Sequence, residues 1–146
     1  MRRTMSQLPA LAVLALLVGA CGLGEATTHT LFLAGEEAGI AELPVTITDE
    51  SGHLKDVSQQ IGWPPGQRPD GPVWSLPGEP QKVRVAWTGG ACDTGTQMRL
   101  QSQGNGFRIA LTTSVKEGQC DAVGIERSVV LTFDRPVAAA LVTIAS

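Results

Sequence analysis

Hydrophobic and polar residues alternate with a period of two along most of the chain beyond residue 28. Val45 and Ile47, for example, alternate with Thr46 and Thr48, which is the pattern of a half-buried β-strand. The same alternation predicts strands in the segments 31–33, 82–88, 97–102, 107–114, 127–134 and 140–145. This part of the chain has no convincing helical period, so strand is the dominant expectation.

Turn-forming residues separate these segments and indicate the fold class. The stretches 49–52 (DESG) and 103–106 (QGNG) are examples. Seven to nine short strands joined in this way predict an all-β domain, which we expect to be an antiparallel immunoglobulin-like β-sandwich. A small closed β-barrel is the alternative. The four strands from 82–88 to 127–134 are expected to run up and down as a meander.

One segment, 58–81, interrupts the alternation because it holds six of the chain's nine prolines. Proline cannot donate to a central ladder, so we expect a long loop with a brief edge strand at 72–75. Trp63 and Trp74 lie in this segment. They are candidates for stacking on a sugar or docking a partner, and the alternative is that both cover the core as lids.

The N-terminus has the order of an export signal. Arg2 and Arg3 precede the apolar run 8–20, and Gly19 and Ala20 lead directly into Cys21. The run is shorter than the roughly 20 residues that a membrane-spanning helix needs. Two interpretations remain, which are lipidation of Cys21 and ordinary secretion after cleavage at the small residues.

The residues Val18-Gly19-Ala20-Cys21 resemble the lipobox that lipoprotein signal peptidase cleaves. The resemblance implies that residues 1–20 are removed and that Cys21 carries a diacylglyceryl thioether and usually an N-acyl chain. Segment 21–28 would then be the lipidated cysteine and its tether, and 29–146 a single domain. The predicted location is the cell membrane or outer membrane, facing outside the cytoplasm, with the lipid on Cys21 as the membrane contact.

Charge narrows the possible partners. Without Arg2 and Arg3, 9 basic residues of the original 11 face 14 acidic ones, for a net charge of −5. No basic stripe remains that could follow phosphates, so we expect no nucleic-acid partner. The expected partner is an envelope protein or a small ligand.

Cys92 and Cys120 are expected to form a disulfide. In the predicted meander, loops 89–96 and 115–126 return to the same end of the sheet, and exported proteins meet oxidising conditions. The pairing also leaves Cys21 as the odd cysteine, as lipidation requires. A redox-active pair or a metal site is the alternative, although there is no CxxC spacing and no histidine nearby in sequence.

Each of these two cysteines is followed by an aspartate, Asp93 or Asp121. A disulfide would bring the two carboxylates to one end of the domain, where they could bind a cation or cap their own turns. A second polar cluster, in segment 49–56, matches no calcium or zinc motif. We therefore predict no metal site and no cofactor.

The segments 85–93 (VAWTGGACD) and 118–137 (GQCDAVGIERSVVLTFDRPV) resemble stretches of bacterial lipoproteins to which no activity is assigned. The resemblance implies a disulfide-bearing β domain. Arg127 matches the arginine that opens the last strand of that pattern. It is either an exposed edge residue or an ion-pair partner for Asp93 or Asp121.

The chain contains no G-x-S-x-G, H-E-x-x-H, P-loop or dinucleotide motif. The sequence therefore predicts a non-catalytic, lipid-anchored binding or interaction module outside the cytoplasm. A structural accessory in envelope assembly that acts by protein contacts is the alternative. A small hydrolase is the third possibility. It would need carboxylates or histidines that converge in a pocket, and His53 and Asp121 in one cleft would favour it.

Overall fold

The computed structural model describes residues 25–34, 42–59, 71–120 and 123–145. Cys21, Trp63 and Asp121 lie outside these ranges, as do the predicted signal segment 1–20 and the first residues of the predicted tether. The alternation of apolar and polar residues correctly predicts that the described part is built from β-strands.

Nine strands and one short 3-10 helix make up the described residues. They are β1 (Thr27–Leu33), β2 (Leu43–Asp49), β3 (Leu54–Ser58), β4 (Val73–Leu76), β5 (Glu79–Gly90), β6 (Asp93–Gln103), β7 (Gly106–Val115), β8 (Gly124–Phe133), the 3-10 helix η1 (Ala139–Leu141) and β9 (Val142–Ala145).

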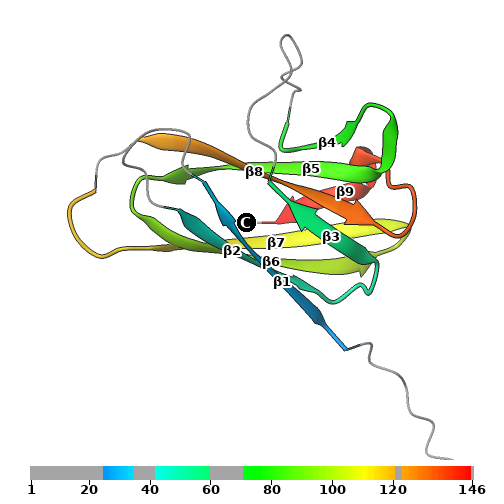
Figure 1. The fold of residues 1–146 in the computed structure, drawn as a ribbon, viewed down its shortest axis with the longest axis horizontal. Helices are drawn as coiled ribbons and strands as arrows, with labels where there is room; N and C mark the ends of the chain where they lie inside the picture. Colours follow the sequence, from blue (N-terminus) through cyan, green and yellow to red (C-terminus); the bar gives the residue numbers. More distant parts are fainter. Residues whose placement is uncertain (1–24, 35–41, 60–70, 121–122, 146) are drawn as a thin grey trace, which may run out of the picture.

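The strands form two sheets that pack face to face (Figure 1). One sheet has five strands in the order β1-β2-β6-β7-β9, and the other has four in the order β3-β8-β5-β4. The two sheets do not close into a barrel, so the alternative of a small β-barrel is wrong.

Two expectations about strand pairing need correction. Only the four-stranded sheet is antiparallel throughout, because β2 pairs with β6, and β7 with β9, in parallel. The four strands from β5 to β8 are also not one meander. β6 and β7 are neighbours in the five-stranded sheet, whereas β5 and β8 pair in the other. The chain therefore crosses between the sheets after β5 and again after β7.

Element boundaries differ from the sequence prediction in two places. β1 begins at Thr27, two residues inside the predicted tether 21–28, because Thr27 and Thr28 already pair with β2. The predicted loop 58–81 is shorter than expected, since β3 includes Ser58, β4 occupies Val73–Leu76 and β5 starts at Glu79. β4 is an edge strand, which confirms the expectation for 72–75 apart from its bounds.

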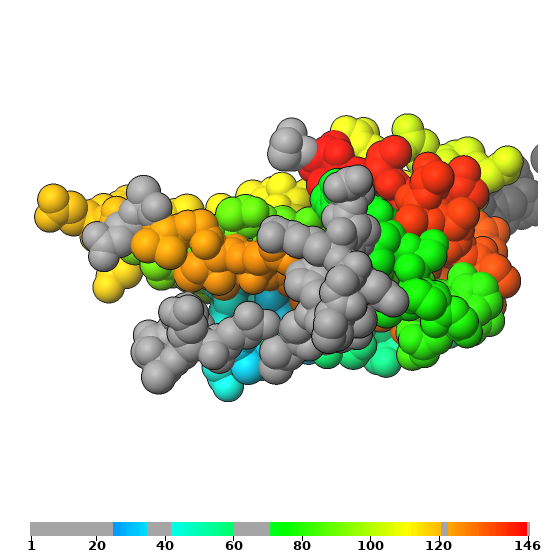
Figure 2. Space-filling view, turned by 90° about the horizontal axis from the view of Figure 1, so that it is seen from above, coloured from blue at the N-terminus to red at the C-terminus, as the bar shows by residue number. Residues whose placement is uncertain are grey.

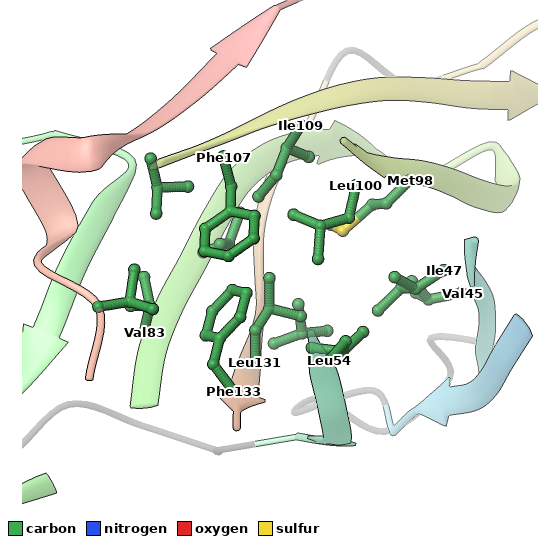
Figure 3. Packing of buried hydrophobic residues seen from close by; sticks show 14 of the residues in the cluster. Val45, Ile47, Leu54, Val83, Met98, Leu100, Phe107, Ile109, Leu131 and Phe133 are labelled. Atoms are coloured by element: carbon green, nitrogen blue, oxygen red, sulfur yellow. The ribbon is translucent and has the colours of Figure 1, made fainter. Parts of the chain in front are cut away.

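The core lies between the two sheets, where the inward-facing side chains of both sheets meet (Figure 3). Its most buried large side chains include Phe107 and Phe133, whose rings stack with centroids 4.6 Å apart. Val83 and Val85 are fully buried, as their phase predicted. Trp87, the next residue in that phase, is partly buried and packs against the same cluster.

The two ends of the sandwich are distinct. At the end where β1 starts, here called the N-terminal end, short turns 50–53, 77–78 and 104–105 join the strands. At the opposite end, here called the disulfide end, β1 ends and β2 begins, the turn 91–92 joins β5 to β6, and β7 ends where β8 begins. In Figure 1 the disulfide end is at the left and the start of β1 at the lower right.

Candidate functional site

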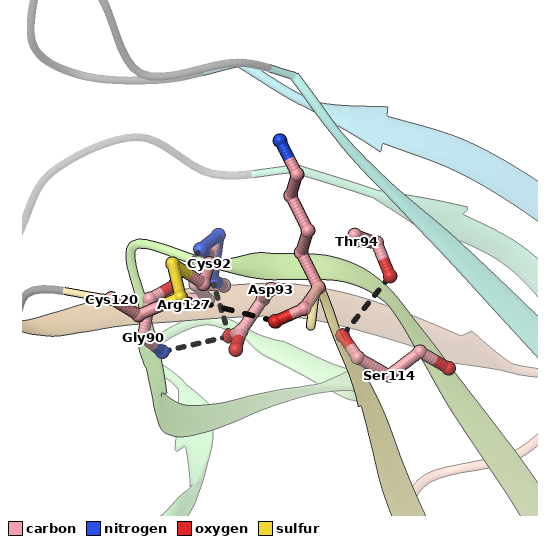
Figure 4. Close-up of a disulfide and its surroundings, with 8 residues drawn as sticks. Gly90, Cys92, Asp93, Thr94, Ser114, Cys120 and Arg127 are labelled. Atoms are coloured by element: carbon pink, nitrogen blue, oxygen red, sulfur yellow. Dashed lines mark hydrogen bonds and ion pairs between the residues drawn. A yellow bond between two sulfur atoms is a disulfide. The ribbon is translucent and has the colours of Figure 1, made fainter. Parts of the chain in front are cut away.

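The disulfide end contains the predicted cysteine pair. Cys92 and Cys120 form a disulfide across a sequence separation of 28, with their Cα atoms 5.9 Å apart (Figure 4). The Lys116 N–H also donates a 2.9 Å hydrogen bond to the Cys92 carbonyl. The disulfide and this hydrogen bond together hold the segment after β7 against the turn between β5 and β6.

The predicted pairing is correct although the meander on which it was based is wrong. Successive strands β5 to β8 still reverse direction at each connection. The connections after β5 and after β7 therefore reach the same end of the domain, whichever sheet each strand joins. The direction of the strands alone was therefore sufficient to predict that Cys92 and Cys120 meet.

Asp93 and Arg127 form a buried ion pair beneath the disulfide. Asp93 Oδ2 lies 3.7 Å from Arg127 Nε, and the two side chains are only 5% and 7% exposed. The Arg127 Nη2 group also donates a 3.0 Å hydrogen bond to the Gly90 carbonyl. Of the two roles expected for Arg127, the structure shows that of ion-pair partner, and its partner is Asp93.

The position of Arg127 follows from strand phase. It shares the inward face of β8 with Val129, Leu131 and Phe133, all of which belong to the core. Asp93 comes from the first position of β6, in the facing sheet. The pair therefore connects the two sheets where the apolar core ends, and mutual charge compensation makes the burial of both groups tolerable.

Gly89 provides the space for this ion pair. A Cβ atom at this position would lie 2.1 Å from Asp93 Oδ2 and 2.9 Å from Arg127 Nε, both closer than real contacts allow. A Cβ at Gly90 would meet Asp93 Oδ1 at an ordinary 3.5 Å. The need for a glycine at position 89 leaves no signal in the sequence, because it arises from side chains of two other strands.

Asp93 also caps the turn that precedes it, which is one of the two roles predicted for this carboxylate. Its Oδ2 accepts a 2.8 Å hydrogen bond from the Gly90 N–H. Among the residues that the structure describes, no group of three or more His, Cys, Asp or Glu side chains is arranged to hold a metal ion. Asp121, the second carboxylate of the predicted cation site, is outside the described ranges.

Trp74 does not join this group. It lies on β4 and pairs in register with Arg84 of β5, whose guanidinium carbon is 5.1 Å from the indole centroid. Arg84 is only 3% exposed, and its Nε donates a 3.0 Å hydrogen bond to Ser128 Oγ. These residues are on the outer face of the four-stranded sheet, opposite to the face that carries Arg127.

Figure 2 shows the molecule from the side of the β4–β5 hairpin (green), next to which the C-terminal segment (red) lies. Two hydrogen bonds join these parts. The Ala139 N–H donates to Ser75 Oγ at 3.1 Å, and the Val137 N–H donates to the Pro80 carbonyl at 2.9 Å. Trp74 is therefore part of a packed strand, where the sequence predicted an edge strand at 72–75.

The N-terminal end has a different polar arrangement. Asp49 is 1% exposed and accepts hydrogen bonds from the backbone of Ser51, Gly52 and Leu54, which confirms the predicted turn. His53 Nδ1 lies 3.0 Å from Asp134 Oδ2, and this hydrogen bond holds the pKa of Asp134 below its usual value. His53 is thus at the end opposite Cys120.

Glu50 accepts hydrogen bonds from Arg99 and, at 2.7 Å, from Gln101. The bond from Arg99 is the larger cause of a lowered pKa at Glu50, and that from Gln101 is the second. Within segment 49–56, Asp49 thus forms a turn, and Glu50 and His53 pair with residues outside the segment.

Within the described ranges, no helix is both long and apolar enough to cross a bilayer. Comparison of the chain with protein-family models, with curated proteins and with solved structures finds no match. The arrangement of the disulfide end is therefore the main basis for a functional proposal.

Proposed function

We propose that this protein is a non-catalytic, lipid-anchored binding module outside the cytoplasm, with an immunoglobulin-like β-sandwich that contacts its partner through the disulfide end. The observation that carries the proposal is the direction of β1. This strand starts at the N-terminal end and runs towards the disulfide end, so an anchor before Thr27 leaves the braced connections on the far side of the domain.

The length of the tether supports this orientation. With Cys21 lipidated, the six residue steps from Cys21 to Thr27 span at most about 20 Å. The seven residues of β1 add roughly a further 20 Å before the chain reaches the disulfide end. The turns of the N-terminal end would therefore lie near the lipid surface, and the disulfide end would face away from it.

Exposed apolar residues support a protein partner at the disulfide end. Phe32, Val115 and Val123 are 61%, 61% and 55% exposed, and all three lie at or next to this end. Of the large hydrophobic side chains exposed in the described part, only Leu141 (47%) lies elsewhere. Side chains of this kind anchor protein contacts when they gather on one surface.

The immunoglobulin-like description is supported by the arrangement of the chain. Two sheets pack face to face, and the chain crosses between them after β2, β5, β7 and β8. Such crossings distinguish sandwiches from up-and-down barrels, in which sequential strands pair around a closed ring.

The anchor is tested by Cys21→Ser in cells that express the full chain. We expect the wild-type protein in the membrane fraction with a covalently bound fatty-acid label, and the variant unlabelled and absent from membranes. The double variant Cys92→Ser/Cys120→Ser is the control, and it should keep the label. Membrane association of Cys21→Ser would contradict the anchor.

The contact surface is tested with a photo-crosslinking residue at Val115 or, as the matched control, at the similarly exposed Leu141 near the other end. Irradiation of intact cells should give a discrete adduct from position 115 and none from position 141. An adduct from position 141 alone, or the same adduct from both, would contradict a contact through the disulfide end.

A further inference from the structure

Three buried polar atoms in the sandwich interior have no hydrogen-bond partner among the described residues. They are Trp87 Nε1, Thr96 Oγ1 and Arg127 Nε. Thr96 is 2% and Arg127 8% exposed. A fourth such atom, His29 Nε2, belongs to β1, which β2 separates from β6. Buried polar groups in native proteins nearly always have a partner, so three in one part of the interior require an explanation.

The three atoms belong to one layer beneath the disulfide. Trp87 and Arg127 are direct register partners on β5 and β8, so their side chains are neighbours on the inward face. Across the sandwich, Asp93 reaches Arg127 and the site of Gly89, which shows that the start of β6 faces the end of β5.

Thr96 extends this layer from the facing sheet. It is inward on β6, in register with Val45 of the core, and separated from Asp93 by the irregularity between Asp93 and Gly95. After Asp93, the next inward residue of β6 is Thr96, and before Gly89 the preceding inward residue of β5 is Trp87. Both therefore lie one step further into the sandwich than the ion pair.

The chemistry of these groups specifies what could satisfy them. An indole N–H and a guanidinium N–H can only donate, whereas a threonine hydroxyl both donates and accepts. A cation is excluded, because the two N–H groups offer it no lone pair. An anion would add an uncompensated negative charge, because Asp93 already balances Arg127 at 3.7 Å. The layer is therefore suited to a neutral oxygen that accepts hydrogen bonds.

We propose that this layer is a binding site for an internal water molecule, which accepts from Trp87 Nε1 and Arg127 Nε and exchanges a hydrogen bond with Thr96 Oγ1. A buried water typically has about three such polar partners. All three atoms are closed to solvent in the described structure, which favours water over any larger molecule. The water would join the two sheets where apolar contacts end, and this proposal does not depend on the lipid anchor.

The first test uses the wild-type protein and water itself as the probe. Nuclear Overhauser measurements should show a cross-peak between the Trp87 indole proton and a water molecule of long residence time. The absence of this cross-peak would overturn the proposal. A neutral hydroxyl or carbonyl oxygen of a co-purified small molecule has the same chemistry. Native mass spectrometry would reveal it as added mass, and that result would overturn the assignment to water.

The second test uses Thr96→Val, which keeps the side-chain shape and removes the hydroxyl. With water bound, the variant loses one of its hydrogen bonds, and the melting temperature should fall by roughly 3–6 °C. With no water, removal of an unsatisfied buried hydroxyl should raise the melting temperature, and this would overturn the proposal. Thr112→Val, at an exposed position of β7, is the matched control and should leave the melting temperature nearly unchanged.

Discussion

The two ends of the sandwich use the same strands but are held together by different interactions. At the N-terminal end, Phe107 and Phe133 stack in the core, and His53 meets the Phe107 ring edge-on with centroids 5.9 Å apart. At the disulfide end, the buried Asp93–Arg127 pair occupies the interior, and the Cys92–Cys120 disulfide fastens the connections above it. One end is held mainly by apolar area, the other by a few specific bonds.

This difference predicts two modes of failure. Apolar packing degrades in proportion to the volume removed, because neighbouring side chains relax only in part around a cavity. A buried ion pair fails abruptly, because displacement of one partner leaves the other charge buried and uncompensated. Substitutions at the two ends should therefore differ both in how much stability they remove and in which part of the structure they disturb.

The largest effect is expected at the N-terminal end. Phe133→Ala removes a ring that is 1% exposed and should lower the free energy of unfolding by about 3–5 kcal/mol, measured by denaturant titration. Phe32→Ala is the matched control, because Phe32 is 61% exposed and its loss should cost less than about 0.5 kcal/mol. Similar losses in the two variants would contradict the placement of the core.

The disulfide should rank second. With a sequence separation of 28, the double variant Cys92→Ser/Cys120→Ser should lose roughly 3–4 kcal/mol in the chain-entropy model. Native-state hydrogen exchange should also accelerate in segment 116–120. The amides of the turn 50–53 should lose only the protection that follows from the lower global stability. Equal acceleration at both ends would show that the ends do not behave separately.

The ion pair gives the third effect. Gly89→Ala introduces a Cβ at 2.1 Å from Asp93 Oδ2, so the pair must separate, at a cost of about 2–3 kcal/mol in unfolding free energy. Gly90→Ala, whose Cβ would be 3.5 Å from its nearest neighbour, should cost less than about 1 kcal/mol. If the two neighbouring glycines tolerate alanine equally, the buried pair does not hold this end together.

Period-two phase was sufficient to predict much of this structure. It identified the strands, and it placed Val83, Val85, Phe107 and Phe133 on inward faces. The same phase puts Arg127 in line with Val129 and Leu131, so an inward arginine was a readable signal of a buried ion pair. Asp49 gave a similar signal, because it continues the inward series of Val45 and Ile47.

The distribution of strands between the sheets was not predictable in the same way. The pairing of β5 with β8 joins residues as distant in sequence as Lys82 and Thr132, and local alternation is the same whether β5 pairs with β6 or β8. Packing of the whole core decides between these pairings. The requirement for Gly89 is equally non-local, because it depends on which side chains the facing strand brings to that point.

The smallest effect concerns the exposed polar contacts of the N-terminal end. The hydrogen bond from His53 lowers the pKa of Asp134 in the folded state, so it stabilises the fold above the unfolded pKa of about 3.9 and is lost as the pH falls through the folded value. Asp134→Asn should lower the melting temperature by about 1–2 °C at pH 6, and the difference from wild type should disappear once the pH falls below the lowered pKa of Asp134. Asp56→Asn, at an exposed position of β3, is the matched control. A pH-dependent difference of several degrees would mean that this end also depends on charge, and the contrast between the two ends would no longer hold.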